Sequence, residues 1–427
     1  MRLLHGFGTL ASKVAAWMYD FGLLGDYIVG ASVKRLSGVE CDPERSHQHE
    51  LHGTRQMCSY LGDGGEYRAT FLRLEDDEQT TETCTGKVTW YDARKNHPTR
   101  SEYRFYYQRN PALGKAVAGD TLAVILKKDQ SVIFASAASG SQSELELFEL
   151  FGGQLSFRFR SVDFRNNRDG VSVGKRFILE HMGVDVKAHF GRDYLDLITA
   201  RFGGLHFPAS KEFSQLACDV AGPLEHFDSV DEAVIGWWNT EEAMFCQLEA
   251  VIIEQKLATG FADVDDFLSF SLSIRQRRNA RAGKALENHL AQLLCSKEVG
   301  YSREARTEQN KRPDFIFPCE RCYRNPNFAA EQLTMLAVKT TCKDRWRQIL
   351  TEAHRIPTKH LLTLQTKISA NQIDEMKGSA VQLVVPRSIQ TTYTEPQRAW
   401  LWDIEKFVAH VTLQQRVASP VEHVNSG

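Results

Sequence analysis

The spacing of apolar residues changes along this chain, from short runs in the first part to mixed helix and strand patterns later. Before about residue 170, runs such as 103–107, 121–126 and 131–135 are alternating or continuously apolar, and glycine or polar residues separate them. Such runs are typical of β-strands. We therefore predict a mainly β, barrel-like domain over residues 1–170.

From about residue 205, helix and strand patterns alternate. Residues 361–364 and 381–385 are apolar runs of strand length, and a helical segment near residues 372–376 lies between them. This alternation predicts an α/β core over residues 205–427. The charged, glycine-bearing stretch 171–204 is expected to connect the two domains.

One region of the second domain adds charged residues to these patterns. Asp314 opens a short apolar run, and a second apolar run, 333–338, ends at Lys339. From Asp344 onward, apolar residues recur at helical spacing, which predicts an amphipathic helix that carries Glu352. Charged side chains are thus expected at a strand start, a strand end and the following helix.

These residue types suit hydrolysis of a phosphodiester. Carboxylates such as Asp314 and Glu352 can hold Mg²⁺, and a cation such as Lys339 can stand beside the attacking water. Alone, each has a plainer interpretation: a Pro-Asp turn, a solvated lysine and a surface glutamate. Their order and spacing together favour a metal-dependent nuclease.

Three neighbouring charged residues, Lys343, Asp344 and Arg345, stand where the strand is expected to become a helix. Lysine and arginine donate to guanine O6 and N7, and aspartate accepts from cytosine N4, so the set suits adjacent G·C pairs. On the predicted helix, Arg345 and Glu352 would lie roughly 10 Å apart along one face. The alternative is a charged helix start, with Asp344 near the positive dipole end.

The segment 271–386 resembles the catalytic domain of the EcoRII-type (type IIE) restriction endonucleases, within the P-D…(D/E)-x-K nuclease superfamily. The resemblance rests on residues 335–350 and on residues 281–287. It implies a restriction-endonuclease-like α/β core and a type II site-specific deoxyribonuclease. It also implies Mg²⁺-dependent cleavage of double-stranded DNA at CCWGG, before the first cytosine.

The resemblance also implies roles for individual residues. Asp314, Lys339 and Glu352 are expected as the catalytic core, and Tyr323 falls at a position implicated in that family's active site. The chain departs from the superfamily pattern at Ala337, where an acid usually stands two residues before the lysine. In the branch that this chain resembles, the following helix supplies the missing carboxylate, and Glu352 fits that relocation.

The first domain resembles the effector domain of the same family, a pseudobarrel related to plant B3 DNA-binding domains. The match involves residues 33–37, 46–48 and 99–104. The candidate effector-DNA contacts are His47, Arg100, Glu102 and Arg104. Their types suit base reading, and the alternative is a charged face of an exposed strand. Pro98 and His52 stand where the family has a lysine and a tyrosine.

An effector domain implies a regulated enzyme. Binding of a second DNA site is expected to shift the protein from an autoinhibited to an open state, so that DNA with two or more sites is cut better. A symmetric target suggests a homodimer through the C-terminal domains. A cognate cytosine DNA methyltransferase is expected in the host, because an active enzyme would otherwise cut its own genome.

Two further residues of the second domain are candidates. Trp237 lies near the place where the family contacts a flipped central base, so its ring is a candidate stacking platform; buried core is the alternative. Glu287, on a predicted helix with a basic cluster over 275–284, is a candidate accessory residue near the metal or a surface residue. The cluster itself is either a DNA contact or a solvated face.

Composition is compatible with these expectations. The chain has 427 residues and a net charge of −2, so DNA binding must come from local basic clusters. Nine cysteines without regular spacing and the absence of a signal or membrane pattern predict a reduced cytoplasm. Cys319 and Cys322 form a single C-x-x-C, a weak zinc signal. Two competing functions are a DNA-binding regulator with an inactive nuclease fold, and a nuclease of the same fold that serves repair or invasion defence with a different target.

Overall fold

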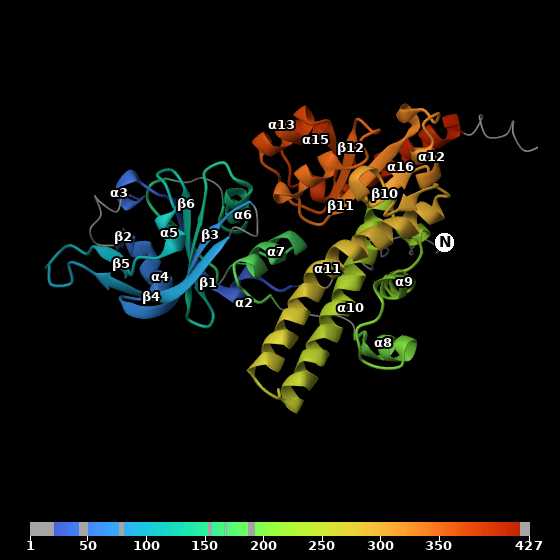
Figure 1. Cartoon of the computed structure of the whole chain (residues 1–427). Coiled ribbons are helices and arrows are strands. Elements are labelled where there is room, and N and C mark those ends of the chain that lie inside the picture. Colours follow the sequence, from blue (N-terminus) through green and yellow to red (C-terminus); the bar gives the residue numbers. More distant parts are fainter. Residues whose placement is uncertain are drawn as a thin grey trace, which may run out of the picture. The chain divides into compact units, whose positions relative to one another are not determined.

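The chain forms two compact units. The computed structural model describes residues 21–41, 50–76, 81–152, 156–165, 167, 169–186 and 193–418. One unit contains Phe21–Lys187 with Lys367–Asn371, and the other contains Ala188–Thr366 with Gln372–Gly427 (Figure 1). The boundary falls inside the segment expected as a connection, and that segment gives helix α7 (Val173–His181) to the first unit and helix α8 (Leu195–Phe202) to the second.

The first unit is built on a mixed sheet in the order β2-β5-β4-β3-β7-β6-β1-β8. The strands are β1 (Ile28–Arg35), β2 (Glu50–His52), β3 (Gly65–Leu74), β4 (Glu82–Asp92), β5 (Tyr103–Tyr107), β6 (Thr121–Lys127), β7 (Val132–Ala137) and β8 (Arg160–Asp163). Neighbours pair antiparallel except β3 and β7, which run parallel with Ala69 opposite Val132. A mainly β unit is therefore present, and its relation to a B3 pseudobarrel stays a prediction.

Short helices complete this unit. They are α2 (Leu24–Tyr27), α3 (Gly38–Cys41), η2 (Arg55–Met57), α4 (Cys58–Leu61), α5 (Pro111–Gly114) and α6 (Gln142–Phe151). The Ser141 side chain accepts from the Glu144 amide and begins α6. The Asn110 side chain does the same for Leu113 in α5, which has proline at its first position.

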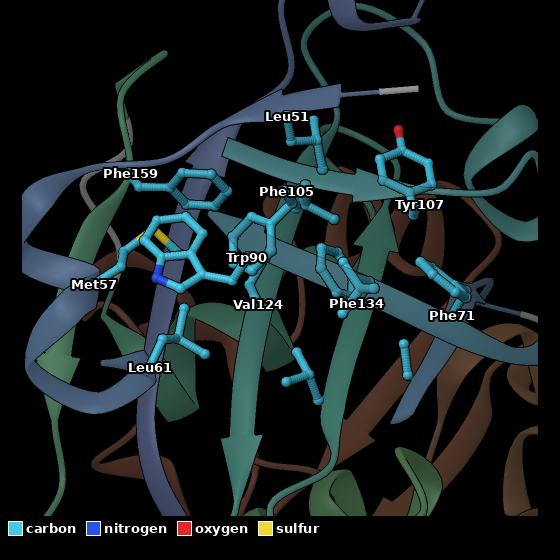
Figure 2. Close-up of a cluster of buried hydrophobic side chains, with 14 of the residues drawn as sticks. Leu51, Met57, Leu61, Phe71, Trp90, Phe105, Tyr107, Val124, Phe134 and Phe159 are labelled. Atoms are coloured by element: carbon cyan, nitrogen blue, oxygen red, sulfur yellow. The ribbon is translucent and has the colours of Figure 1, made fainter. Parts of the chain in front are cut away.

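Aromatic side chains fill the interior of this sheet (Figure 2). The Phe134 ring lies 5.2 Å from that of Phe71 and 5.3 Å from that of Phe105, and Phe105 lies 4.5 Å from Trp90. All of these rings are buried. Packing is tight enough that a side chain at Gly30 would meet the ring of Tyr60 at 2.4 Å. The sheet thus encloses a core of its own, as an independent domain requires.

The second unit has a five-stranded sheet in the order β13-β12-β11-β10-β9. Its strands are β9 (Ser302–Arg303), β10 (Phe315–Phe317), β11 (Thr334–Lys339), β12 (Lys359–Thr363) and β13 (Val381–Val384). β11, β12 and β13 run parallel, whereas β9, β10 and β11 pair antiparallel. The predicted α/β core is confirmed, with helix α13 (Ala370–Gly378) connecting β12 to β13.

Two long helices dominate the rest of this unit. Helix α10 (Val230–Thr259) begins at Ser229, whose side chain accepts from the Glu232 amide, and ends at Gly260, where φ is +79°. Asp263 then caps helix α11 (Val264–Ser296). The remaining helices are α9 (Ser210–Ala221), η4 (Leu224–His226), η5 (Glu308–Asn310), α12 (Glu320–Arg324), η6 (Ala330–Gln332), η7 (Lys343–Thr351), α14 (Arg387–Gln390), α15 (Glu395–Trp400) and α16 (Ile404–Ala418).

Helix α16 packs against the sheet through aromatic rings. Phe407 lies 5.6 Å from Phe317 of β10 and 5.3 Å from His360 of β12. Its first turn is tied to α10, because the Asp231 carboxylate accepts from the amides of Ile404 and Glu405. In the described part of the chain, no helix is both long and apolar enough to cross a membrane.

Candidate functional site

Asp314 lies immediately before β10 and faces the end of β11. Its Oδ2 accepts from the Val338 amide at 2.7 Å and lies 3.3 Å from the Lys339 ammonium. The antiparallel pairing of Phe315 with Leu336 brings the two strands to this register. The predicted neighbourhood of Asp314 and Lys339 is therefore present.

Glu352 completes this group of charges, but not from a helix. The segment expected as an amphipathic α-helix is the 3₁₀ helix η7, and Glu352 follows it with extended backbone (φ −100°, ψ 149°). Trp346 and Ile349, three residues apart, are both buried, a spacing that suits a 3₁₀ helix as well as an α-helix, so the apolar pattern did not distinguish the two. The helical placement of Glu352, and with it the spacing to Arg345, was wrong.

The Glu352 carboxyl interacts electrostatically with Asp314 and Lys339. Burial raises the pKa of the Glu352 carboxyl, and the charge of Asp314 raises it further, while Lys339 opposes the shift. Two neighbouring carboxylates repel each other when both are ionised, and a bound cation would offset that repulsion. Ala337, two residues before the lysine, is buried in β11, and Glu352, in the segment after the strand, stays the predicted second acid.

The donor set fits Mg²⁺. Two carboxylates supply the hard oxygen ligands that the ion prefers, and Mg²⁺ commonly keeps several waters and shares substrate phosphates. Among the described residues, no group of three or more His, Cys, Asp or Glu side chains is arranged as a metal site. Asp314 and Glu352 are the carboxylates that could hold such an ion, with water in its other positions.

Tyr323 lies beside this centre in α12 but is buried. Its hydroxyl donates to both oxygens of Glu308, at 2.7 and 2.6 Å. Burial and this carboxylate raise the pKa of Tyr323. Burial alone would raise the pKa of Glu308, but hydrogen bonds from Tyr323 and from backbone amides hold it below its ordinary value. The Tyr323 hydroxyl is thus committed to a neighbouring side chain.

The base-reading candidates lie in the first turn of η7. The backbone of Lys343, Asp344 and Arg345 follows β11 after a short link, as expected. Their side chains lie outside the described part of the structure. Recognition of G·C pairs by these residues stays a prediction.

The candidate effector contacts are only partly brought together. His47 lies outside the described residues. Arg100 is exposed before β5, whereas Glu102 accepts from Arg104, and Arg104 also donates to Glu50 of β2 at 2.7 Å. The pKa of Glu102 is lowered, first by its hydrogen bond with Arg104. These residues form a paired charged network, and DNA contact by them stays a prediction.

The two departures from the family pattern flank this network. The His52 ring nitrogen lies 3.6 Å from the Glu102 carboxylate. Pro98 is exposed in the stretch between β4 and β5. The Pro98 side chain has no hydrogen-bond donor, whereas the His52 ring can donate an N–H.

Trp237 is not available for stacking on a base. It lies inside α10, its side chain is 2% exposed, and its indole donates to the Gly222 carbonyl at 2.8 Å. Trp238 beside it is also buried and donates to the Ala282 carbonyl at 3.1 Å. The helix buries this pair against α9 and α11. The alternative interpretation, buried core, is therefore correct, and the prediction that a flipped base stacks on Trp237 was wrong.

Several basic residues of the stretch 275–284 in α11 form ion pairs with carboxylates. Arg281 is buried and forms an ion pair with Glu242, so it is neither a DNA contact nor a solvated residue. Glu287 accepts from Lys284 at 3.0 Å and from Arg303 at 2.8 Å. Glu287 is therefore held by two cations, and its accessory role stays a prediction.

The C-x-x-C pair caps a helix. The Cys319 sulfur accepts from the Cys322 amide at the start of α12, and the two sulfurs lie 2.8 Å apart. Both are free thiols. The helix cap explains why a sulfur-bearing residue precedes α12.

Three side chains near the centre were missed in the sequence. Glu308 and Lys359 contact the segment that follows Glu352, and Arg355 lies in that segment and contacts Tyr323, as described below. Lys359 carried a weak signal, because it opens an otherwise apolar strand. Glu308 and Arg355 carried none, since their partners are distant in the sequence or are backbone carbonyls.

Comparison with known proteins identifies relatives of the second unit. Residues 245–408 match the family described as EcoRII C terminal. The chain is 41% identical over 211 residues to the type II restriction enzyme EcoRII of Escherichia coli, over 49% of this chain and 51% of that enzyme. The matched region thus spans about half the length of this curated relative.

Similar solved structures include metal-depleted Ecl18kI in complex with uncleaved, modified DNA. It has a TM-score of 0.41 and 17% identity, over 55% of this chain and 86% of that chain. The complex of restriction endonuclease PspGI with substrate DNA has a TM-score of 0.39 and 15% identity, over 49% and 93% of the two chains.

Proposed function

We propose, from the premise that residues 245–408 of this chain belong to the EcoRII C-terminal family, that the protein is a type II restriction endonuclease acting on double-stranded DNA. The observation that carries the proposal is the contact of Asp314 with Lys339 at the end of β11, inside the matched segment, together with the electrostatic interaction of Glu352 with both residues. These are the charges that phosphodiester hydrolysis requires.

Each of the three residues has a distinct part in the reaction. Asp314 is held by the Val338 amide, which fixes one carboxylate oxygen and leaves the other for a ligand. Glu352 supplies the second carboxylate. The Lys339 ammonium stands beside Asp314, where it can orient the attacking water and favour its ionised form. Mg²⁺, when bound, would neutralise the charge that develops on the phosphate.

The proposed target is CCWGG, cut before the first cytosine. Lys343, Asp344 and Arg345 support it, because their types suit two adjacent G·C pairs and their position follows Lys339 by one short link. With Trp237 buried, no residue is assigned to the central base pair.

The proposed regulation and partners follow from the first unit. Arg100, Glu102 and Arg104 support binding of a second DNA site there, through types suited to base reading. A homodimer would match a symmetric target, and a host cytosine methyltransferase would protect the genome. Autoinhibition released by the second site completes the proposal.

The test is cleavage of a multi-site plasmid by the purified chain with Mg²⁺, followed by sequencing of the ends. We expect cuts before CCWGG, and a loss of about 10²-fold or more in Lys339→Ala, because that variant lacks the cation beside the attacking water. Lys377→Ala, on the exposed surface of α13, is the matched control and should cut normally. Cutting by Lys339→Ala at the control rate would contradict the assignment.

The second candidate function is a sequence-specific regulator with an inactive nuclease fold. The partly exposed ion pairs of Arg104 with Glu50 and Glu102 are the charged groups of the first unit that would support this alternative. Specific binding without cuts under any divalent metal would support the regulator. The intact group of Asp314, Lys339 and Glu352 favours the enzyme.

A further inference from the structure

The turn that follows Glu352 has an unusual backbone. Ala353 has φ +47°, a left-handed conformation that a non-glycine residue adopts at a cost. Its side chain is fully buried, so the turn cannot simply relax toward solvent. The Ile356 amide closes the turn by donating to the Ala353 carbonyl at 2.9 Å. A turn of this kind beside a catalytic carboxylate has to be held by its surroundings.

Lys359 holds this turn from the sheet. It begins β12, is 5% exposed, and its ammonium donates to the carbonyls of Ala353 and Ile356 at 2.6 Å each. Burying an ammonium costs free energy unless hydrogen bonds and opposite charges compensate for the water it loses. Two carboxylates, Glu308 and Glu352, lie close enough for their charges to favour the ionised ammonium. The lysine is thus committed to the segment that carries Glu352.

Glu308 holds the same turn from η5. Its carboxylate accepts from the His354 amide at 3.2 Å and from the Tyr323 hydroxyl. Arg355 adds a third attachment, because its guanidinium donates to the backbone carbonyls of residues 323, 325 and 328. The three attachments come from separate elements, so the turn is fixed in more than one direction.

We propose that Lys359 and Glu308 are positioning residues that hold the turn 352–356 and thereby keep the Glu352 carboxylate beside Asp314. This inference rests on the proposed function, since it assigns Glu352 to metal binding. Tyr323 then acts through Glu308 and not on the DNA, which agrees with its burial. Partners of this kind, one shell outside the ligands, set metal affinity in many enzymes.

The first test measures metal binding without catalysis. Mn²⁺ binding to the DNA-free full-length chain is followed by electron paramagnetic resonance, with thermal melting to verify folding. We expect Lys359→Met and Glu308→Gln to weaken Mn²⁺ binding by about 10- to 100-fold. Lys377→Met, which removes an exposed lysine of α13, should bind as the wild type does. Asp314→Asn shows how much Mn²⁺ affinity is lost when a proposed metal ligand itself is removed.

The second test separates positioning from DNA binding. Single-turnover cleavage in Lys359→Met should fall by about 10-fold or more, with part of the rate restored by excess metal. The affinity for DNA in Ca²⁺ should stay unchanged. In addition, Glu308→Gln and Tyr323→Phe should be non-additive, because they remove two ends of one hydrogen-bonded pair.

The outcomes distinguish the two proposals. If wild-type chain binds Mn²⁺ but cuts no DNA, the proposed function fails, and the Mn²⁺ comparison still decides the positioning role. If folded Lys359→Met and Glu308→Gln bind Mn²⁺ as Lys377→Met does, the positioning role is overturned. Should Lys359→Met fail to fold, Glu308→Gln decides by the same comparison, because glutamine keeps the shape of the side chain.

Discussion

At the scale of single residues, burial changes the chemistry of several ionisable groups in the second unit. Glu352 shows this most directly: burial and Asp314 raise its pKa, so a proton competes with a cation for the carboxylate. Lys359 shows the opposite case, in which burial lowers the pKa of an ammonium that two backbone carbonyls hold in place. Neither effect follows from residue type.

A buried histidine makes the stability of the second unit dependent on pH. Burial, and after it the charge of His410, lower the pKa of His360 from 6.5 to about 4. The neutral form of His360 therefore adds its full share to the free energy of unfolding above pH 6.5, and this share is lost as the pH falls toward 4. This amounts to about 3 kcal/mol. We expect a smaller loss for His360→Gln, measured by urea unfolding at pH 7 and pH 4.5.

His206→Gln is the matched control, since His206 is exposed. It should lose stability on acidification as the wild type does. If His360→Gln also loses as much as the wild type, protonation of His360 is not the cause.

At the scale of elements, the second unit depends on contacts between helix ends that are far apart in the sequence. The buried carboxylate of Asp231, in the first turn of α10, accepts from the amides of Arg387, Ile404 and Glu405. It thereby satisfies amides at the starts of α14 and α16, which have no partner within their own helices. One side chain thus joins three helices.

Asp231→Ala should therefore destabilise this unit by about 3 kcal/mol, because buried amides would lose their acceptor. The measurement is the urea midpoint of the full-length chain, followed by tryptophan fluorescence. Asp374→Ala removes an exposed carboxylate of α13 and should change stability by less than about 0.5 kcal/mol. Equal midpoints for the two variants would show that the helix starts find other partners.

At the scale of the whole molecule, the chain has two compact units, and the proposed second DNA site is assigned to the first of them. If the first unit binds an effector site, plasmids with three CCWGG sites should be cut faster per site than plasmids with one. The physical reason is that linked sites raise the local concentration of the second DNA. The measurement is the initial rate per site on matched plasmids.

Arg104→Ala should remove most of this difference while leaving the one-site rate unchanged, since Arg104 lies in the first unit. Equal rates per site for one-site and three-site plasmids would contradict second-site activation. A fall in both rates would instead indicate that Arg104 supports the fold of the first unit.

The sequence by itself determined a mainly β part followed by an α/β part, the strand that begins just after Asp314 and the strand that ends at Lys339. These follow from local periodicity and from residue order, which are properties of neighbouring residues. It also specified Glu352 as the second acid, because no acid stands at Ala337.

Only the tertiary structure decided how Glu352 is presented, that Trp237 belongs to the core, and that Lys359 and Glu308 hold the turn beside the centre. The physical reason is that burial and hydrogen bonding here join segments distant along the chain, such as η5, α12 and β12. The local pattern of apolar and polar residues does not show which distant residues will become hydrogen-bond partners.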